Sequence, residues 1–194
     1  MSVHFDPKQH LYTVDGVQLP SVTEVCRFLA YDYKSAQPWL AEAAARRGTA
    51  VHEACALIDY DEIPEETPGT AGYLKAYRRF LADYRPDWEL IEYSMGNTKL
   101  GYAGTLDRYG VIDGETAIVD IKTGQLHNAA LSAQLTGYQC LLYTDPRCYV
   151  TQARYALKLS NDGTYELRRV EESTELLRAC LFIHKAVTKK GKMK

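Results

Sequence analysis

The segment from Gly104 to Gly124, GTLDRYGVIDGETAIVDIKTG, constrains the fold more than any other part of the chain. Asp113-Gly114 lies between two runs rich in β-branched and aromatic residues. This pair favours a two-residue type I′ turn, because both turn positions need a positive φ angle. With these residues as the loop, Ile112 pairs with Glu115 and the register of both strands is fixed. A three-residue loop would shift that register, so the sequence leaves both alternatives open.

The rest of the chain alternates between helix-forming and strand-forming segments. A β-hairpin around Asp15-Gly16 opens it, and Gly96-Asn97 predicts a turn inside a block of strands. We expect helices at residues 21–32, 38–59, 73–84, 129–143 and 173–189, and strands at residues 88–95, 100–107, 109–112, 116–121, 148–157 and 164–170. This order predicts an α/β fold: a central mixed β-sheet flanked by helices, preceded by an N-terminal β-hairpin and helices.

The length of the chain, 194 residues, suits one domain with a sizeable buried core. We expect residues 1–37 to form the N-terminal hairpin and helix, residues 38–170 the α/β core, and residues 171–194 a C-terminal helix with a basic tail. The composition, 46% apolar and 25% charged, excludes global disorder. The cysteines are scattered without a C-x-x-C motif, which argues against a disulfide scaffold or a zinc ribbon: Cys26, Cys55, Cys140, Cys148 and Cys180.

Charge and hydropathy exclude further classes of protein. The formal net charge of −2 and the pI of about 6.2 give no global positive field, so any contact with nucleic acid must rest on local groups. No stretch approaches the ~18 apolar residues of a membrane-spanning helix. The N-terminus lacks the basic start and apolar run of an export signal, so we expect a cytoplasmic protein with no membrane partner.

Two carboxylates and an ammonium converge at one end of the predicted hairpin. In the two-residue-loop register, Asp107 lies opposite Asp120, with Cβ atoms roughly 5 Å apart. Lys122 shares the face of Asp120, because side chains alternate along a strand, and the carbonyl of Ile121 stays beside the same edge. Such hard oxygen ligands suit Mg²⁺ or Mn²⁺, and a cation would offset the repulsion. The alternative is an Asp–Lys pair on a sheet edge that contributes little.

These residues resemble the signature of the PD-(D/E)XK nuclease superfamily, in which an aspartate and a hairpin turn precede a D-x-K triplet. Three further motifs are similar to its RecB-type exonuclease branch: RGTAVHE at residues 47–53, GTLD at residues 104–107 and QLTGY at residues 134–138. The opening segment, FDPKQHLYTVDGVQLPSVTEV, resembles the start of phage and prophage nucleases. The resemblance covers roughly residues 1–160 and implies a restriction-endonuclease-like core.

The resemblance also implies roles for single residues. His52 faces Gly48 and Ala56, one helical turn away on either side, which leaves room for a sheet end to approach. A lone helical histidine is nevertheless more often a surface or core residue than a ligand. Lys122 would orient or polarise the attacking water. The implied metal ligands are His52, Asp107, Asp120 and the carbonyl of Ile121, and the implied catalytic residues are Asp107, Asp120 and Lys122.

Other side chains are candidates for contact with substrate. Gln134 and Tyr138 share one helical face, and the resemblance implies that this face contacts the nucleotide or the scissile phosphate; a helix–sheet rim is the alternative. In the predicted register Thr105 lies opposite Lys122 and could hold its ammonium. Arg46 and Arg47, at the start of the histidine motif, are favoured for contact with DNA phosphates, and the role of KKGKMK at residues 189–194 is left open. Glu53 could orient substrate or be solvated, and Glu92 could support the site or hold a second metal.

The motifs together favour a divalent-metal-dependent DNA exonuclease of phage-type recombination, replication or repair, acting in the bacterial host cell. An endonuclease that nicks DNA or selects DNA structures would use the same site. A non-catalytic DNA-binding accessory protein of recombination is an alternative of another class. Because no helicase segment accompanies the motifs, we expect the protein to act alone, as a homo-oligomer, or with a separately encoded recombination or single-strand-binding protein.

Overall fold

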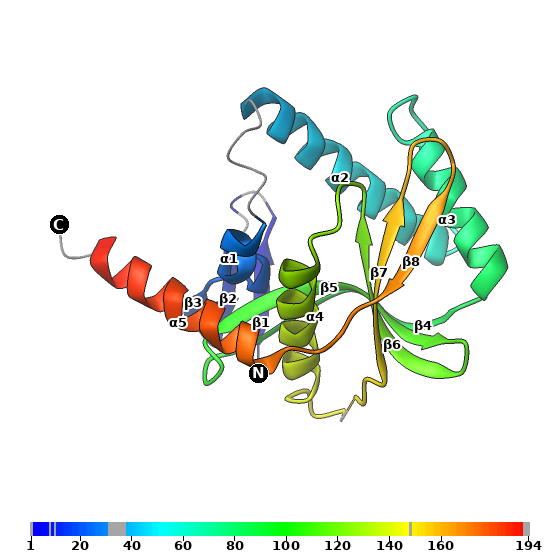
Figure 1. Cartoon of the computed structure of the whole chain (residues 1–194). Helices are drawn as coiled ribbons and strands as arrows, with labels where there is room; N and C mark the ends of the chain where they lie inside the picture. Colours follow the sequence, from blue (N-terminus) through cyan, green and yellow to red (C-terminus); the bar gives the residue numbers. More distant parts are fainter. Residues whose placement is uncertain (1, 8, 10, 31–37, 148, 192–194) are drawn as a thin grey trace.

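The computed structural model describes residues 2–7, 9, 11–30, 38–147 and 149–191, which form two β-sheets and several helices (Figure 1). Three expectations fall outside the described part: the helix end at Asp32, the strand start at Cys148, and the side chains of the lysine-rich end. None of the described helices combines the length and the hydropathy needed to cross a membrane.

The N-terminal sheet contains the predicted hairpin and one further strand. Strands β2 (Leu11–Val14) and β3 (Val17–Leu19) are joined by Asp15 and Gly16, whose φ angles of 47° and 80° are those the turn requires. Strand β1 (Val3–Asp6) pairs antiparallel with β2. The sequence analysis did not predict β1, because its apolar–polar alternation, VHFD, spans only four residues.

The helix after this sheet is shorter than predicted. Helix α1 (Val22–Cys26) begins where expected, because the hydroxyl of Ser21 accepts the backbone N–H of Glu24 at 3.0 Å. The expected continuation is wrong: from Arg27 the chain tightens into the 3₁₀ turn η1 (Arg27–Leu29), where the N–H of Ala30 bonds back three residues to the carbonyl of Arg27.

The central sheet is mixed, as predicted. Its order is β4-β5-β6-β7-β8, and every neighbouring pair is antiparallel except β6–β7. Helix α4 (Asn128–Leu142) makes the crossover that a parallel pair needs. The five strands are β4 (Asp87–Asn97), β5 (Tyr102–Ile112), β6 (Glu115–Lys122), β7 (Ala153–Leu159) and β8 (Tyr165–Arg169).

The register of the β5–β6 hairpin is the predicted one. Pairing runs from Ile112–Glu115 to Arg108–Val119 around a two-residue turn with positive φ angles. Two details differ from expectation. The segments 100–107 and 109–112 form one strand, β5, and Gly96-Asn97 lies within β4 instead of in the turn. A Cβ atom on Gly96 would collide with the side chain of Val14, so this glycine permits packing against the N-terminal sheet.

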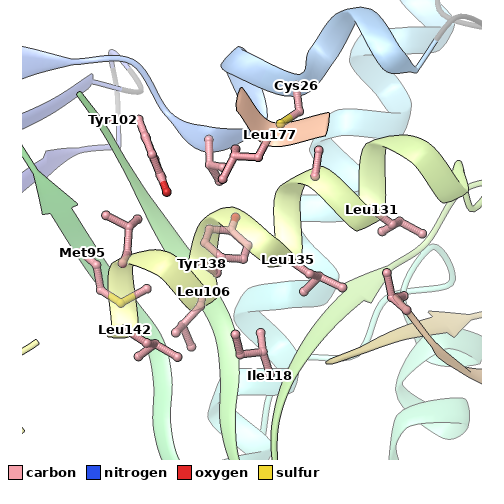
Figure 2. Close-up of a cluster of buried hydrophobic side chains, with 14 of the residues drawn as sticks. Cys26, Met95, Tyr102, Leu106, Ile118, Leu131, Leu135, Tyr138, Leu142 and Leu177 are labelled. Carbon is pink, nitrogen blue, oxygen red and sulfur yellow. The ribbon is translucent and has the colours of Figure 1, made fainter. Parts of the chain in front are cut away.

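Helices cover both faces of the central sheet (Figure 1). On one face α2 (Pro38–Asp59) and α3 (Ala71–Tyr84) bury Val51, Leu74 and Phe80 against the strands. On the other face α1, α4 and α5 (Thr174–Gly191) enclose a second core. Figure 2 shows its side chains: Leu131, Leu135 and Tyr138 of α4 lie near Leu106 and Ile118 of the sheet. The expected α/β architecture is therefore confirmed.

Candidate active site

The two aspartates of the predicted pair lie at the same end of β5 and β6, where the hairpin ladder stops. Asp107 and Asp120 are 7% and 1% exposed. The last pair of the ladder, Arg108–Val119, lies next to them, and the carboxylate of Asp107 crosses to accept the backbone N–H of Ile121 at 2.6 Å. Each carboxylate therefore lies in the electrostatic field of the other, as the register predicts.

Asp107 is held in its charged form by its neighbours. Its Oδ1 lies 3.4 Å from Nδ1 of His52, which α2 brings over the end of the sheet. Burial alone would raise the pKa of Asp107, but the charge of His52 and its hydrogen bond lower that pKa to about 2. Burial alone would lower the pKa of His52, and the Asp107 carboxylate raises it to about 9. The histidine motif and the first aspartate thus meet.

Asp120 is bound from two sides. Its Oδ2 forms an ion pair with Nζ of Lys122 at 2.6 Å, and its Oδ1 accepts a hydrogen bond from Nε2 of Gln134 at 3.1 Å. Burial raises the pKa of Asp120; the ammonium of Lys122 opposes that shift, and the nearby Asp107 carboxylate adds to it. The aspartate and the lysine of the D-x-K triplet are therefore joined by an ion pair.

Gln134 and Tyr138 lie beneath the aspartates. The amide of Gln134 also lies within hydrogen-bond distance of the Tyr138 hydroxyl, at 3.1 Å, and of the Thr23 hydroxyl, at 3.3 Å. Both side chains are buried, at 8% and 4% exposed. A Cβ on Gly104 would stand 2.8 Å from the ring of Tyr138, so the glycine of GTLD makes room for the tyrosine. These contacts position Asp120, a role that the spacing of the motif did not predict.

Glu92 is the third acid at this end of the sheet. The pairs Ile91–Arg108 and Tyr93–Leu106 flank it and place it beside Asp107. Its φ angle of 47° lies in the left-handed region that non-glycine residues rarely adopt. Burial and the Asp107 carboxylate raise the pKa of Glu92 to about 7, although Arg108 opposes the shift. Strained backbone beside clustered acids is typical of functional sites.

The donor atoms present fit a divalent cation. One ligand atom each of His52, Glu92 and Asp107 lies within 4.8 Å of the other two. Two carboxylates and an imidazole are a suitable set for Mn²⁺ and, through the carboxylates, for Mg²⁺. Of the predicted ligands, His52 and Asp107 belong to this group, and Glu92, a candidate for a second metal, completes it. The carboxylate of Asp120 contacts Lys122 and Gln134, and the backbone N–H of Ile121 binds Asp107; ligation by Asp120 and by the Ile121 carbonyl stays a prediction.

Arg108, which the sequence analysis missed, joins the site to the core. Its guanidinium is fully buried, donates to Asp59 at 2.6 Å and to Glu92 at 2.9 Å, and reaches the carbonyl of Asp107 at 2.6 Å. Tyr77 donates to the same Asp59 carboxylate at 2.7 Å. The sequence carries no clear signal for this role, because an arginine normally predicts a solvated position.

The three remaining residues predicted to contact substrate lie in different surroundings. Arg46 is exposed and 3.7 Å from Glu42, whereas the guanidinium of Arg47 lies over the Tyr73 ring at 5.8 Å. The hydrogen-bond partners of the Thr105 hydroxyl differ from the predicted one. Instead of the ammonium of Lys122, its recorded partners are Tyr12 at 2.9 Å and Ser94 at 2.7 Å, because the N-terminal sheet packs on this stretch of β5.

A cavity of about 680 Å³ lies over the acids, and we name it the acid cavity. His52, Glu92 and Asp107 line it, together with exposed Glu53 of α2 and the N-terminal sheet. The site is therefore open to a ligand of small-molecule size, such as a nucleotide unit.

Comparisons with known proteins identify similar solved structures only at low identity. No family profile and no curated protein matches the chain. An exonuclease candidate from Eubacterium rectale is 14% identical over 91% of this chain and 75% of its own, with a TM-score of 0.47. LHK-Exo, solved in complex with dAMP, is 16% identical over 89% of this chain and 87% of its own, with a TM-score of 0.41. The protein SSO0001 is 12% identical over 62% of this chain, with a TM-score of 0.37, and the chain spans 58% of its length.

Proposed function

We propose that this protein is a divalent-metal-dependent DNA exonuclease. The observation that carries the proposal is the convergence of His52, Glu92 and Asp107, with ligand atoms within 4.8 Å of one another, beside the Asp120–Lys122 ion pair. A divalent cation held by these three side chains supplies Lewis acidity and positive charge at the phosphate. A bound cation would offset the repulsion between carboxylates that the fold holds close together, which explains why they are clustered here.

The other residues of the site prepare the phosphodiester for attack. Lys122 is 29% exposed, and Asp120 fixes the position of its ammonium beside the ligand group. From there it orients the attacking water and offsets charge on the phosphate. Gln134 holds the Asp120 carboxylate in turn, so the helix behind the sheet sets the direction of Lys122. The products are a shortened strand and a released nucleotide.

The opening segment and the motif order support a place in phage-type recombination, replication or repair. We infer that the chain acts as one domain, with DNA as its partner. A separately encoded recombination or single-strand-binding protein, and further copies of the chain, are the protein partners we propose beside DNA.

Digestion of end-labelled linear DNA and covalently closed circular DNA tests the activity. With Mg²⁺ or Mn²⁺ we expect linear DNA to be degraded and the circle to survive, and with a chelator we expect no cleavage. Asp107→Asn should lower the rate by roughly a thousandfold or more, because it removes a charged ligand. Glu89→Gln, a change of an exposed acid on β4, is the matched control and should keep the rate.

The same assay separates the alternatives. Nicking of the closed circle would replace the exonuclease with an endonuclease. DNA binding without metal-dependent cleavage by the purified protein would favour the non-catalytic accessory protein.

A further inference from the structure

A second cavity, of about 770 Å³, adjoins the site from the α4 side. We name it the α4 cavity. It lies among α1, η1, the segment after β6, and α5. Its walls are mainly apolar: Cys26, Phe28, Leu131 and Ile183. Polar and basic groups also line it, namely Arg27, Gln125 and His127.

The α4 cavity is continuous with the catalytic residues. Lys122 and Gln134 line it, and both bind the Asp120 carboxylate, at 2.6 Å and 3.1 Å. Thr23 lines the α4 cavity and the acid cavity alike, and its hydroxyl lies 3.3 Å from the amide of Gln134. The two cavities therefore meet at the group of side chains that holds Asp120.

This arrangement matches the shape of a phosphodiester. Every internal phosphate of a DNA strand joins two nucleosides, one on each side. A phosphate placed between the ligand group in the acid cavity and Lys122 sends one nucleoside toward the acid cavity. The other nucleoside then points past Lys122 into the α4 cavity.

The walls of the α4 cavity suit a nucleoside chemically. Its volume lies within the range of roughly 300–1,000 Å³ in which proteins bind small molecules. Phe28 offers an aromatic face for a base, while the amide of Gln125 offers a hydrogen-bonding group for the edge of the base. Arg27 can meet the next phosphate along the strand. Stacking is tolerant of base identity, so the cavity suits an enzyme that degrades any sequence.

We propose that the α4 cavity is the subsite for the nucleoside on one side of the scissile phosphate. The subsite rests on the proposed nuclease function and adds to it the way the enzyme grips a single nucleotide unit. Loss of the subsite should weaken cleavage because the nucleotide is no longer positioned well, although the groups that carry out the chemistry stay in place.

Substrates with one abasic residue test this subsite. The abasic sugar is placed on either side of one labelled bond, and kcat/KM for that bond is measured with Mg²⁺. Wild-type protein should lose roughly tenfold or more with the abasic residue on one side only, which corresponds to the stacking of one base. Phe28→Ala should lose a similar factor on normal DNA and lose nothing further on the abasic substrate. Phe182→Ala, at a 75% exposed aromatic residue on α5, is the control and should behave as wild type.

A second variant removes the space instead of the aromatic face. Calorimetry in a chelator should detect binding of dTMP by wild-type protein, and Ala130→Trp should fill the α4 cavity and abolish that binding. Equal abasic sensitivity in wild type and Phe28→Ala, or unchanged dTMP binding in Ala130→Trp, overturns the subsite and leaves the nuclease proposal intact. Absence of metal-dependent cleavage of every substrate overturns the nuclease function instead.

Discussion

At Asp120, folding and catalysis make opposite demands on one side chain. Burial raises the pKa of this carboxyl, which means that the folded protein favours its neutral form. At neutral pH the charged form is nonetheless needed to hold Lys122, 2.6 Å away. The neighbouring Asp107 carboxylate adds repulsion to the cost of burial. Such a residue is retained for its chemistry and lowers the stability of the fold.

The Asp120→Asn variant should therefore lose activity and keep or gain stability. Asparagine keeps an oxygen for the amide of Gln134 but carries no charge to pair with Lys122. We expect cleavage to fall by roughly 10²-fold or more. The thermal midpoint should be equal to or above that of wild type, measured by calorimetry at pH 7. A variant that is both active and less stable than wild type would contradict this account.

At the scale of elements, α4 decides how well the site is aligned, because it carries Gln134 and Tyr138 beneath the sheet. The helix approaches α1 closely at Gly137, where a Cβ atom would collide with the side chain of Val22. The carbonyl of Gly137 also accepts a hydrogen bond from Tyr102 at 3.2 Å. Because Gly137 has no side chain, α4 can pack close to α1 at this position.

Gly137→Ala should displace α4 and disturb the site without touching it. Overpacking of this kind costs about 1–3 kcal/mol of the free energy of unfolding. The shift of Gln134 should also lower kcat. Gly124→Ala is the matched control: nothing lies within 4 Å of a Cβ atom there, so the change should stay within about 0.5 kcal/mol. Urea denaturation measures both, and equal midpoints for the two variants would refute the argument.

The turn segment after α4 gives the fold a local pH dependence. Hydrogen bonds from Arg147, at 3.0 Å, hold the pKa of Asp145 at about 2. Because this pKa is lower than that of the unfolded chain, near 4, the charged Asp145 stabilises the fold at pH values above about 4. The stabilisation disappears as the pH falls toward 2. Because Arg147 is half exposed, we expect on the order of 1 kcal/mol. Between pH 4 and 2, the free energy of unfolding of wild type should fall by about 1 kcal/mol more than that of Asp145→Asn. Asp87→Asn, a change at an exposed position, is the control and should behave as wild type. Parallel curves for wild type and Asp145→Asn would disprove it.

Local chemistry explains which elements the sequence could predict. Asp113-Gly114 fixed the β5–β6 register, because a two-residue turn with positive φ has few alternatives. Strand β1 was not predicted, because its apolar–polar alternation covers only four residues, and it forms by pairing with β2. The Thr105 contact was assigned to the wrong partner for the same reason: the N-terminal sheet that provides Tyr12 lies 93 residues earlier in the chain.

On the scale of the whole molecule, Arg108 connects the helical layer to the site. Asp59, the last residue of α2, accepts a hydrogen bond from its Nε, and Glu92 of β4 accepts one from its Nη1. The site is thus fixed between α2 and α4, one on each face of the sheet (Figure 1). Sequence patterns could not reveal this, because an arginine normally predicts a solvated position. The carboxylates that make its burial tolerable come from distant segments.

Replacing Arg108 tests whether this connection holds the molecule together. Arg108→Met should cost about 3–5 kcal/mol, because the buried Asp59 carboxylate is left without a counter-charge. Asp59→Asn removes that charge, so the double variant Arg108→Met/Asp59→Asn should recover part of the loss, with a coupling of at least about 1 kcal/mol in urea denaturation. Cleavage should stay low in the refolded double variant, since Glu92 has still lost its partner. If the two substitutions are simply additive in stability, the ion pair does not fasten α2 to the sheet, and the position of His52 must depend on apolar packing of α2 and on its own contact with Asp107.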